Sequence, residues 1–78
     1  MTFGRRLKRL RKHRRLTQAR LAKILGVSRS SECAYEAGTR EPGHETLLRI
    51  SNYFGCSIDY LLTGKVIVRR RVINGPRE

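Results

Sequence analysis

The stretch "LTQARLAKILGVSRSSECAYEAG", residues 16–38, decides the fold. Thr17 is a good helix cap, because its hydroxyl can accept a free backbone N–H of the turn that follows. Gly26 is suited to end that helix, since glycine tolerates the positive φ that a helix terminus often requires. Ser28 then caps a second helix, which we expect to run from Arg29 to Ala37. The apolar residues that share one face of the first helix are Leu21, Ala22 and Leu25.

The gap between these two helices is short, and its spacing is typical of a helix-turn-helix arrangement. In that arrangement the second helix lies across the first. In DNA-binding proteins built this way, the second helix enters the major groove while the start of the first helix meets a phosphate. The spacing alone therefore indicates nucleic acid as a candidate partner.

Working outward from this pair, three further helices are predicted. Residues 2–16 carry a narrow apolar stripe at helical spacing, with basic residues around the rest of each turn. A loop rich in helix breakers, "AGTREPG", separates the central pair from two more apolar segments, residues 44–54 and 58–63. We therefore predict an all-α fold of five helices over residues 1–64. The stripe residues of the first segment are Phe3, Leu7 and Leu10.

The remaining residues, 65–78, form a basic tail with the sequence "KVIVRRRVINGPRE". Its Val and Ile residues favour a strand, and the Asn-Gly pair and the proline that follow favour a turn. The tail sequence is compatible with a short strand, one that could pair with its twin in a dimer, and equally with an unstructured basic arm.

Charge is distributed very unevenly along the chain. The 18 basic residues outnumber the 6 acidic ones, for a net charge of +12, and no acid occurs before Glu32. A strong positive field over half of a small domain attracts polyanions, either nucleic acid or an anionic membrane surface. No apolar run approaches the length of a membrane span or resembles a secretion signal, and two cysteines make no disulfide framework. We therefore expect a cytoplasmic protein that binds a polyanion and not a membrane.

Four short motifs together carry a resemblance to a known family. They are "LTQ..LA..LGVS", "YE.G.REP", "ETL..I..YF" and "S.DYLL", and they occur in this order between residues 16 and 62. None is specific alone, but the ordered set resembles the phage repressor and Cro-type (XRE-like) helix-turn-helix domain, a lambda-repressor-like fold, over about residues 3–64. The resemblance implies a transcriptional regulator, expected to be a repressor, that binds double-stranded DNA as a homodimer on a near-palindromic operator.

The resemblance also implies roles for individual residues. Gln18 matches the position that grips a phosphate at the start of the first helix of the pair, where the backbone N–H groups help. Arg29, Ser30 and Ala34 match positions that contact bases, and Arg11 and Glu36 match a structural salt bridge. The whole predicted DNA-binding set is Gln18, Ser28, Arg29, Ser30, Cys33, Ala34, Thr39 and Arg40.

Helical periodicity checks this assignment independently of the resemblance. At about 100° per residue, Glu32 and Tyr35 share one side of the helix with Glu36 at its margin. The opposite side is sparse, with one arginine, one serine, one cysteine and two alanines. Arg29 suits a guanine, although a phosphate contact fits it equally well. Part of the specificity is then expected to come from DNA shape.

Glu32 departs from the family pattern, which has an apolar residue at that position. A lone buried carboxylate is costly, so it must pair, become protonated or lean out to solvent. Our hypothesis is that Glu32 pairs with an arginine of the first helix, competing with or extending the pair formed by Arg11 and Glu36. On that hypothesis Glu32→Gln destabilises the fold.

Other chemistries find less support in the sequence. The two histidines and two cysteines lack the paired short spacings of a zinc site, and no catalytic constellation is visible, so we expect neither a metal, nor another cofactor, nor an enzyme. Cys33 is either a redox-sensitive residue on the DNA side or simply a small residue. Two alternatives to a specific regulator stay open: an antitoxin-like or adaptor module that binds a protein, and a packaging protein that binds nucleic acid through charge alone.

Overall fold

The computed structural model describes residues 1–65 and is all-α over that range, which confirms the predicted fold class. Its helices are α1 (Phe3–His13), α2 (Gln18–Leu25), α3 (Arg29–Ala37), α4 (His44–Phe54) and α5 (Ile58–Thr63). The predicted tail strand lies outside the described residues, and the division into a domain of residues 1–64 and a tail stays a prediction.

Side-chain caps start four of the five helices within residues 1–65, including the two at Thr17 and Ser28 that the sequence predicted. The hydroxyls of Thr2, Thr17, Ser28 and Ser57 each accept the backbone N–H three residues later, at 2.9–3.2 Å. Each bond satisfies one of the free N–H groups of a first helical turn. Only α4 begins without such a bond, because its N-cap is Gly43.

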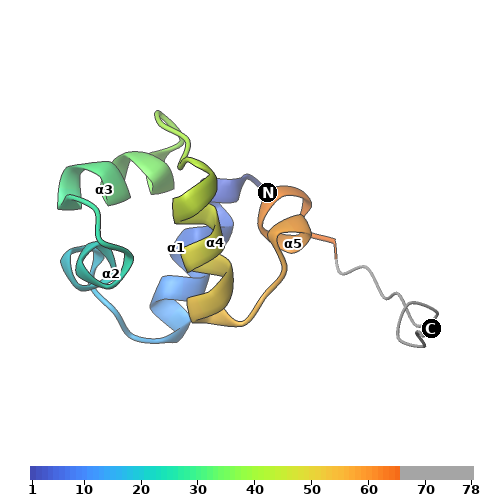
Figure 1. Ribbon diagram of the computed structural model, residues 1–78, viewed down its shortest axis with the longest axis horizontal. Helices are drawn as coiled ribbons and strands as arrows, with labels where there is room; N and C mark the ends of the chain where they lie inside the picture. The colour runs from blue at the N-terminus through green and yellow to red at the C-terminus, as the bar shows by residue number, and fades with distance from the viewer. Residues whose placement is uncertain (66–78) are drawn as a thin grey trace.

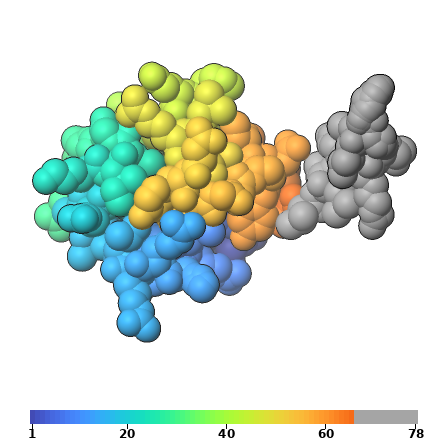
Figure 2. Space-filling model, turned by 60° about the horizontal axis from the view of Figure 1, so that its bottom comes forward, coloured from blue at the N-terminus to red at the C-terminus, as the bar shows by residue number. Residues whose placement is uncertain are grey.

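In the view of Figure 1, α1 and α4 overlap in the middle, with α2 and α3 on one side and α5 on the other. Helices α2 and α3 pack against each other, α3 and α5 pack against α1, and α4 contacts α2 and α5. Figure 2 shows α4, in yellow, exposed between α2 on one side and α5 on the other. Each helix contributes at least one residue to a single core, which consists of Leu7, Leu21, Leu25, Tyr35, Ile50, Phe54 and Leu61.

Gly4 allows α1 to approach the end of α3 very closely. A Cβ atom built on Gly4 would lie 2.7 Å from the carbonyl oxygen of Tyr35 and closer still to that of Glu36. Real Cβ atoms do not approach backbone atoms this closely, so only glycine fits without a shift of one helix. This contact fixes how α3 lies relative to α1.

Arginine side chains bind the carboxyl ends of helices other than their own. Arg6, although 95% buried, donates from Nε to the carbonyl oxygen of Leu61 at 2.8 Å and from Nη2 to that of Leu62 at 2.9 Å. Arg49 donates from Nη1 to the carbonyl oxygen of Leu25 at 2.9 Å. A cation at a helix carboxyl end satisfies free carbonyls and opposes the negative end of the helix dipole.

Arg14 makes a looser contact of the same kind with the end of α4. Its guanidinium lies 3.3 Å from the carbonyl oxygen of Phe54 and about 5 Å from the centres of the Tyr53 and Phe54 rings. The basic residues of α1 therefore fall into two groups, because some hold the fold together and others remain at the surface. The exposed basic residues of α1 that make no such contact are Arg5, Lys8, Arg9 and Lys12.

None of the helices within residues 1–65 is both long enough and apolar enough to cross a membrane.

Candidate nucleic-acid interface

The turn between α2 and α3 has the geometry that the sequence predicted. Gly26 adopts a left-handed conformation with φ of 73°, and its N–H bonds back to the last turn of α2. Val27 donates from its N–H to the carbonyl oxygen of Ala22 at 3.0 Å, which closes the helix end. Ser28 then caps α3, so only three residues separate the two helices. This is a helix-turn-helix unit, in which α3 is exposed along one side.

The two sides of α3 separate as the helical periodicity predicted. Glu32 is fully buried and Tyr35 is 5% exposed, whereas Arg29 and Ser30 at the start of the helix are exposed. Ala34 is half-buried, so its methyl group lies at the edge of the exposed face. The exposed side thus presents one cation and several small groups, as expected.

The predicted ion pair between Arg11 and Glu36 is present. Arg11 donates from Nε to Glu36 Oε2 at 2.7 Å and from Nη2 to Oε1 at 3.1 Å, and both side chains are at least nine-tenths buried. A third bond joins Arg11 Nη1 to the carbonyl oxygen of Leu16 at 2.7 Å. This two-pronged pair, which is a strong form of ionic hydrogen bond, holds α1, the loop before α2 and α3 together.

The ionisation of both partners reflects this contact. Burial by itself raises the pKa of Glu36, but the hydrogen bonds that its carboxylate accepts from Arg11 and Gln18 outweigh burial and leave the pKa below its usual value. The hydrogen bond to Glu36 likewise raises the pKa of Arg11. Both groups are therefore charged at neutral pH.

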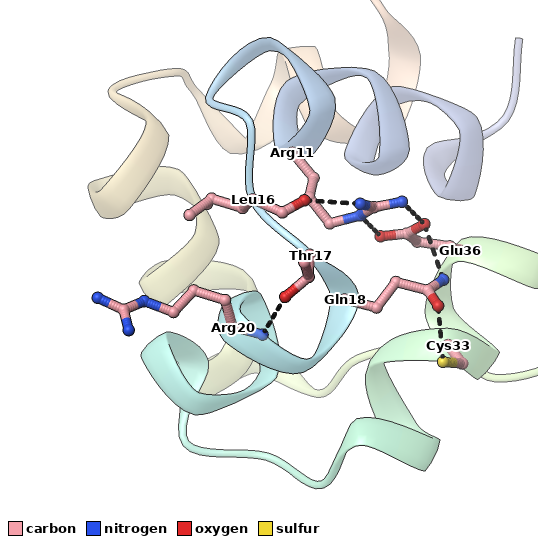
Figure 3. A network of polar contacts seen from close by, with 7 residues as sticks. All are labelled: Arg11, Leu16, Thr17, Gln18, Arg20, Cys33 and Glu36. Atoms are coloured by element: carbon pink, nitrogen blue, oxygen red, sulfur yellow. Dashed lines mark hydrogen bonds and ion pairs between the residues drawn. The ribbon is translucent and has the colours of Figure 1, made fainter.

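Gln18 belongs to the same polar network, as Figure 3 shows. Its Nε2 donates to Glu36 Oε1 at 3.2 Å, and its Oε1 accepts from the thiol of Cys33 at 3.2 Å. These two partners define which way the amide faces, because a carboxylate only accepts and the thiol here donates. The amide has a second N–H, and the residue lies at the first position of α2, where a phosphate contact was predicted.

Cys33 is less available to a ligand than its place on the helix suggested. The residue is half-buried, and its thiol points toward Gln18 between α2 and α3. Within residues 1–65 no group of His, Cys, Asp or Glu side chains is arranged to hold a metal ion.

Ser31, which was not among the predicted residues, brings together two that were, Ser28 before α3 and Arg40 after it. Ser28 donates to the hydroxyl of Ser31 at 3.0 Å, and Arg40 Nη1 donates to the same hydroxyl at 2.9 Å. Thr39 bonds through its N–H to the carbonyl oxygen of Ala34 at 3.1 Å. The Arg40 side chain thus reaches back to the first turn of α3 and adds a second cation to this helix. Only the i, i+3 spacing of the two serines hinted at Ser31.

The hypothesis that Glu32 pairs with an arginine of α1 is wrong. Neither of its carboxyl oxygens receives a hydrogen bond from any residue of the described chain. The reason is that Arg11, the arginine at this position of α1, directs its hydrogen bonds to Glu36 and to the carbonyl oxygen of Leu16. Burial, together with the nearby Glu36, instead raises the pKa of Glu32 to about 8.

Comparison with known proteins agrees with this geometry. Residues 4–67 match the family model described as a helix-turn-helix domain. The chain belongs to the phage repressor-type helix-turn-helix family. The resemblance stated from the four motifs is confirmed.

Members of this helix-turn-helix family from phages and bacteria are similar to the chain in sequence. The uncharacterised HTH-type transcriptional regulator YqaE of Bacillus subtilis is 48% identical over 63 residues, which are 81% of this chain and 54% of YqaE. Repressor protein C2 of Salmonella phage P22 is 41% identical over 62 residues, which are 80% of this chain and 29% of the repressor. The chain spans about half, or less, of the length of these relatives.

Solved structures of the same helix-turn-helix family have the same fold. The crystal structure of the P22 c2 repressor in complex with a synthetic operator superposes with a TM-score of 0.79 at 38% identity. The match covers 83% of this chain and 98% of that one. A transcriptional regulator from Listeria innocua has a TM-score of 0.76 at 34% identity, covering 87% of this chain and 63% of that one.

Proposed function

We propose that the protein is a sequence-specific transcriptional regulator, acting as a repressor, which binds double-stranded DNA with α3 in the major groove. The observation that carries this proposal is the exposed side of α3. It combines the cation of Arg29 with small groups that allow the helix to approach the bases closely, on a helix-turn-helix unit similar to that of an operator-bound repressor. A DNA-binding regulator of this kind would act in the cytoplasm.

Each residue of the predicted DNA-binding set has a role in this proposal. Arg29 reads a guanine through its two-pronged guanidinium, while Ser30 and Ala34 contact base edges, the latter through a thymine methyl group. Gln18 and the N–H groups at the start of α2 bind one phosphate. Arg40, held along α3 by Ser31, binds a second phosphate. Ser28, Cys33 and Thr39 complete the surface around these contacts.

Homodimer formation on a near-palindromic operator belongs to the same proposal. Leu48 on α4 is 41% exposed and Leu62 on α5 is 52% exposed, and Leu62 lines a hollow together with Phe3, Pro42 and Leu47. Large apolar side chains of this kind are candidates for burial against a second copy. Two copies would read half-sites about 10 base pairs apart, one turn of DNA.

The test is selection of genomic fragments by the purified protein, followed by the same selection with Arg29→Ala. Loss of a G·C preference at one position, with other positions unchanged, is expected for a base-reading arginine. Lys8→Ala is the matched control, since it removes one exposed cation from α1 and should weaken binding to all sequences alike. The logarithm of affinity should fall with the logarithm of salt concentration, with a slope of about −0.9 per phosphate contacted.

Three outcomes would contradict the proposal. Random DNA that competes as well as any genomic fragment would indicate packaging by charge alone. Absence of DNA binding at low salt would favour the protein-binding module instead. A monomer that binds a single half-site with full affinity would remove the homodimer from the proposal.

A further inference from the structure

Glu32 is a buried acid in a position that its neighbours do not neutralise directly. Its side chain has no exposed surface, and neither carboxyl oxygen accepts an N–H or O–H from residues 1–65. Glu36 follows four residues later in α3, and side chains at this spacing are neighbours on a helix. Two carboxyl groups therefore lie next to each other on the inward side of α3, the helix that is proposed to read DNA.

Within residues 1–65, the surroundings hold too little positive charge for both carboxyl groups to be ionised. From α1, Arg11 supplies a single cation, and its hydrogen bonds go to Glu36 and to a backbone carbonyl. From α2 the amide of Gln18 contacts the network and carries no charge, and α3 itself adds only the thiol of Cys33. An ionised Glu32 would leave an uncompensated negative charge in the interior, which is strongly unfavourable.

The Glu36 carboxylate has room for one more donor. It already accepts two N–H groups from Arg11 and one from Gln18. A carboxylate offers about four acceptor positions, so one position is left. A protonated Glu32 has one O–H donor and no other partner, and this O–H would fill the remaining position.

We propose that Glu32 is a neutral carboxylic acid whose O–H donates to the Glu36 carboxylate, and that this proton positions Glu36 for Arg11 and Gln18. Glu32 is thus a positioning residue, because it acts on the DNA-facing side through Glu36 and Gln18 without touching DNA. Its effect on DNA binding rests on the function proposed above, whereas the shared proton does not.

The expected pH dependence follows from the direction of the shift. Burial, and then the adjacent Glu36, raise the pKa of Glu32 from 4.5 to about 8, while Arg11 opposes them. A raised pKa means that the folded chain holds a proton that the unfolded chain releases. The contribution of this proton to the free energy of unfolding is full below pH 4.5. It declines as pH rises and is lost above about pH 8. Within this window the folding equilibrium constant falls by up to about tenfold per pH unit.

The first experiment uses the unaltered full chain and no DNA. The carbon resonance of the Glu32 side-chain carboxyl group is followed by NMR from pH 4 to pH 9.5. The proposal expects its main titration step near pH 8, in coupled response with Glu36. A titration step of Glu32 at or below pH 5 would overturn the proposal without reference to any variant.

The second experiment compares Glu32→Gln with wild type in urea unfolding across the same range. An amide N–H can replace the O–H donor and cannot ionise, so the variant should match wild type near pH 4 and become increasingly more stable than wild type as the pH rises toward 9. Glu45→Gln is the matched control, since Glu45 is exposed on α4 and should leave the wild-type pH profile unchanged. A Glu32→Gln variant that is much less stable than wild type at pH 6 would overturn the proposal.

The third experiment measures affinity for a genomic fragment selected as above, at pH 7 and pH 9. Wild type should lose affinity at pH 9 relative to Glu32→Gln, with Glu45→Gln following wild type. If Glu32→Gln and wild type lose DNA affinity equally between pH 7 and pH 9, Glu32 has no positioning role in DNA binding. Absence of any DNA binding contradicts the proposed function, while the NMR titration still decides whether the proton is shared.

Discussion

The replacement Gly4→Ala tests the close approach of α1 to α3, and two physical effects predict opposite signs for its effect on stability. Alanine is favoured over glycine within a helix by about 0.5–1 kcal/mol, so helix propensity alone predicts stabilisation. The added Cβ, however, would lie 2.7 Å from the carbonyl oxygen of Tyr35 and closer to that of Glu36. Both atoms belong to the backbone of α3 and cannot rotate away.

Relief of this overlap requires α1 and α3 to move apart. Overpacking of this kind costs about 1–3 kcal/mol, and backbone neighbours favour the upper end of that range. After subtraction of the propensity gain, we expect a loss of about 2 kcal/mol in the free energy of unfolding. For a domain of this size, that loss lowers the melting temperature by about 8–16 °C.

The assay for Gly4→Ala is urea unfolding followed by the helical circular dichroism signal. Lys8→Ala and Lys8→Gly are the matched controls, since Lys8 is exposed in the same helix and their difference measures propensity without a clash. If Gly4→Ala is as stable as wild type, or more stable by the amount that the Lys8 pair gives, the argument from close approach is refuted.

Two further predictions concern charged and capping groups. Arg11→Ala should lower the free energy of unfolding by about 3–5 kcal/mol, because it leaves the Glu36 carboxylate buried without a cation. A double variant with Glu36→Ala should lose less stability than the two single variants combined. Strict additivity of the two losses would contradict this reasoning. Gly43→Asp should raise the stability by about 0.5–1 kcal/mol, because α4 lacks a side-chain cap and an acid suits a helix start. Urea unfolding measures this gain as well, and Gly43→Ala, which adds a side chain without an acceptor, should not reproduce it.

The helices were predictable because their start and stop signals are local. Thr17 and Ser28 each cap through an N–H only three residues away, and the positive φ of Gly26 is a property of that residue. The same holds for the two sides of α3, which depend only on helical periodicity. Such features need no knowledge of the rest of the chain.

The polar network was not predictable in the same way. Periodicity placed Glu32 inward, but which partner it meets depends on where the donors of Arg11 point, and that is set by packing between helices. The bond between Gln18 and Cys33 joins residues 15 positions apart across two helices. The buried position of Arg6 against the end of α5 was not predictable from the number of basic residues. Composition does not distinguish structural arginines from surface arginines.

The arginines that bind helix ends have a consequence for cooperativity. If the last turn of α5 opens, Arg6 loses two of its three carbonyl partners and keeps only the carbonyl oxygen of Met1, so a buried cation in α1 is left less well compensated. Opening of the end of α2 likewise breaks the hydrogen bond from Arg49 in α4 to the carbonyl oxygen of Leu25. Local opening therefore removes support from a neighbouring helix, and partly open states should be rare. Amide hydrogens near these helix ends should then exchange mainly through unfolding of the whole domain, at a common free energy.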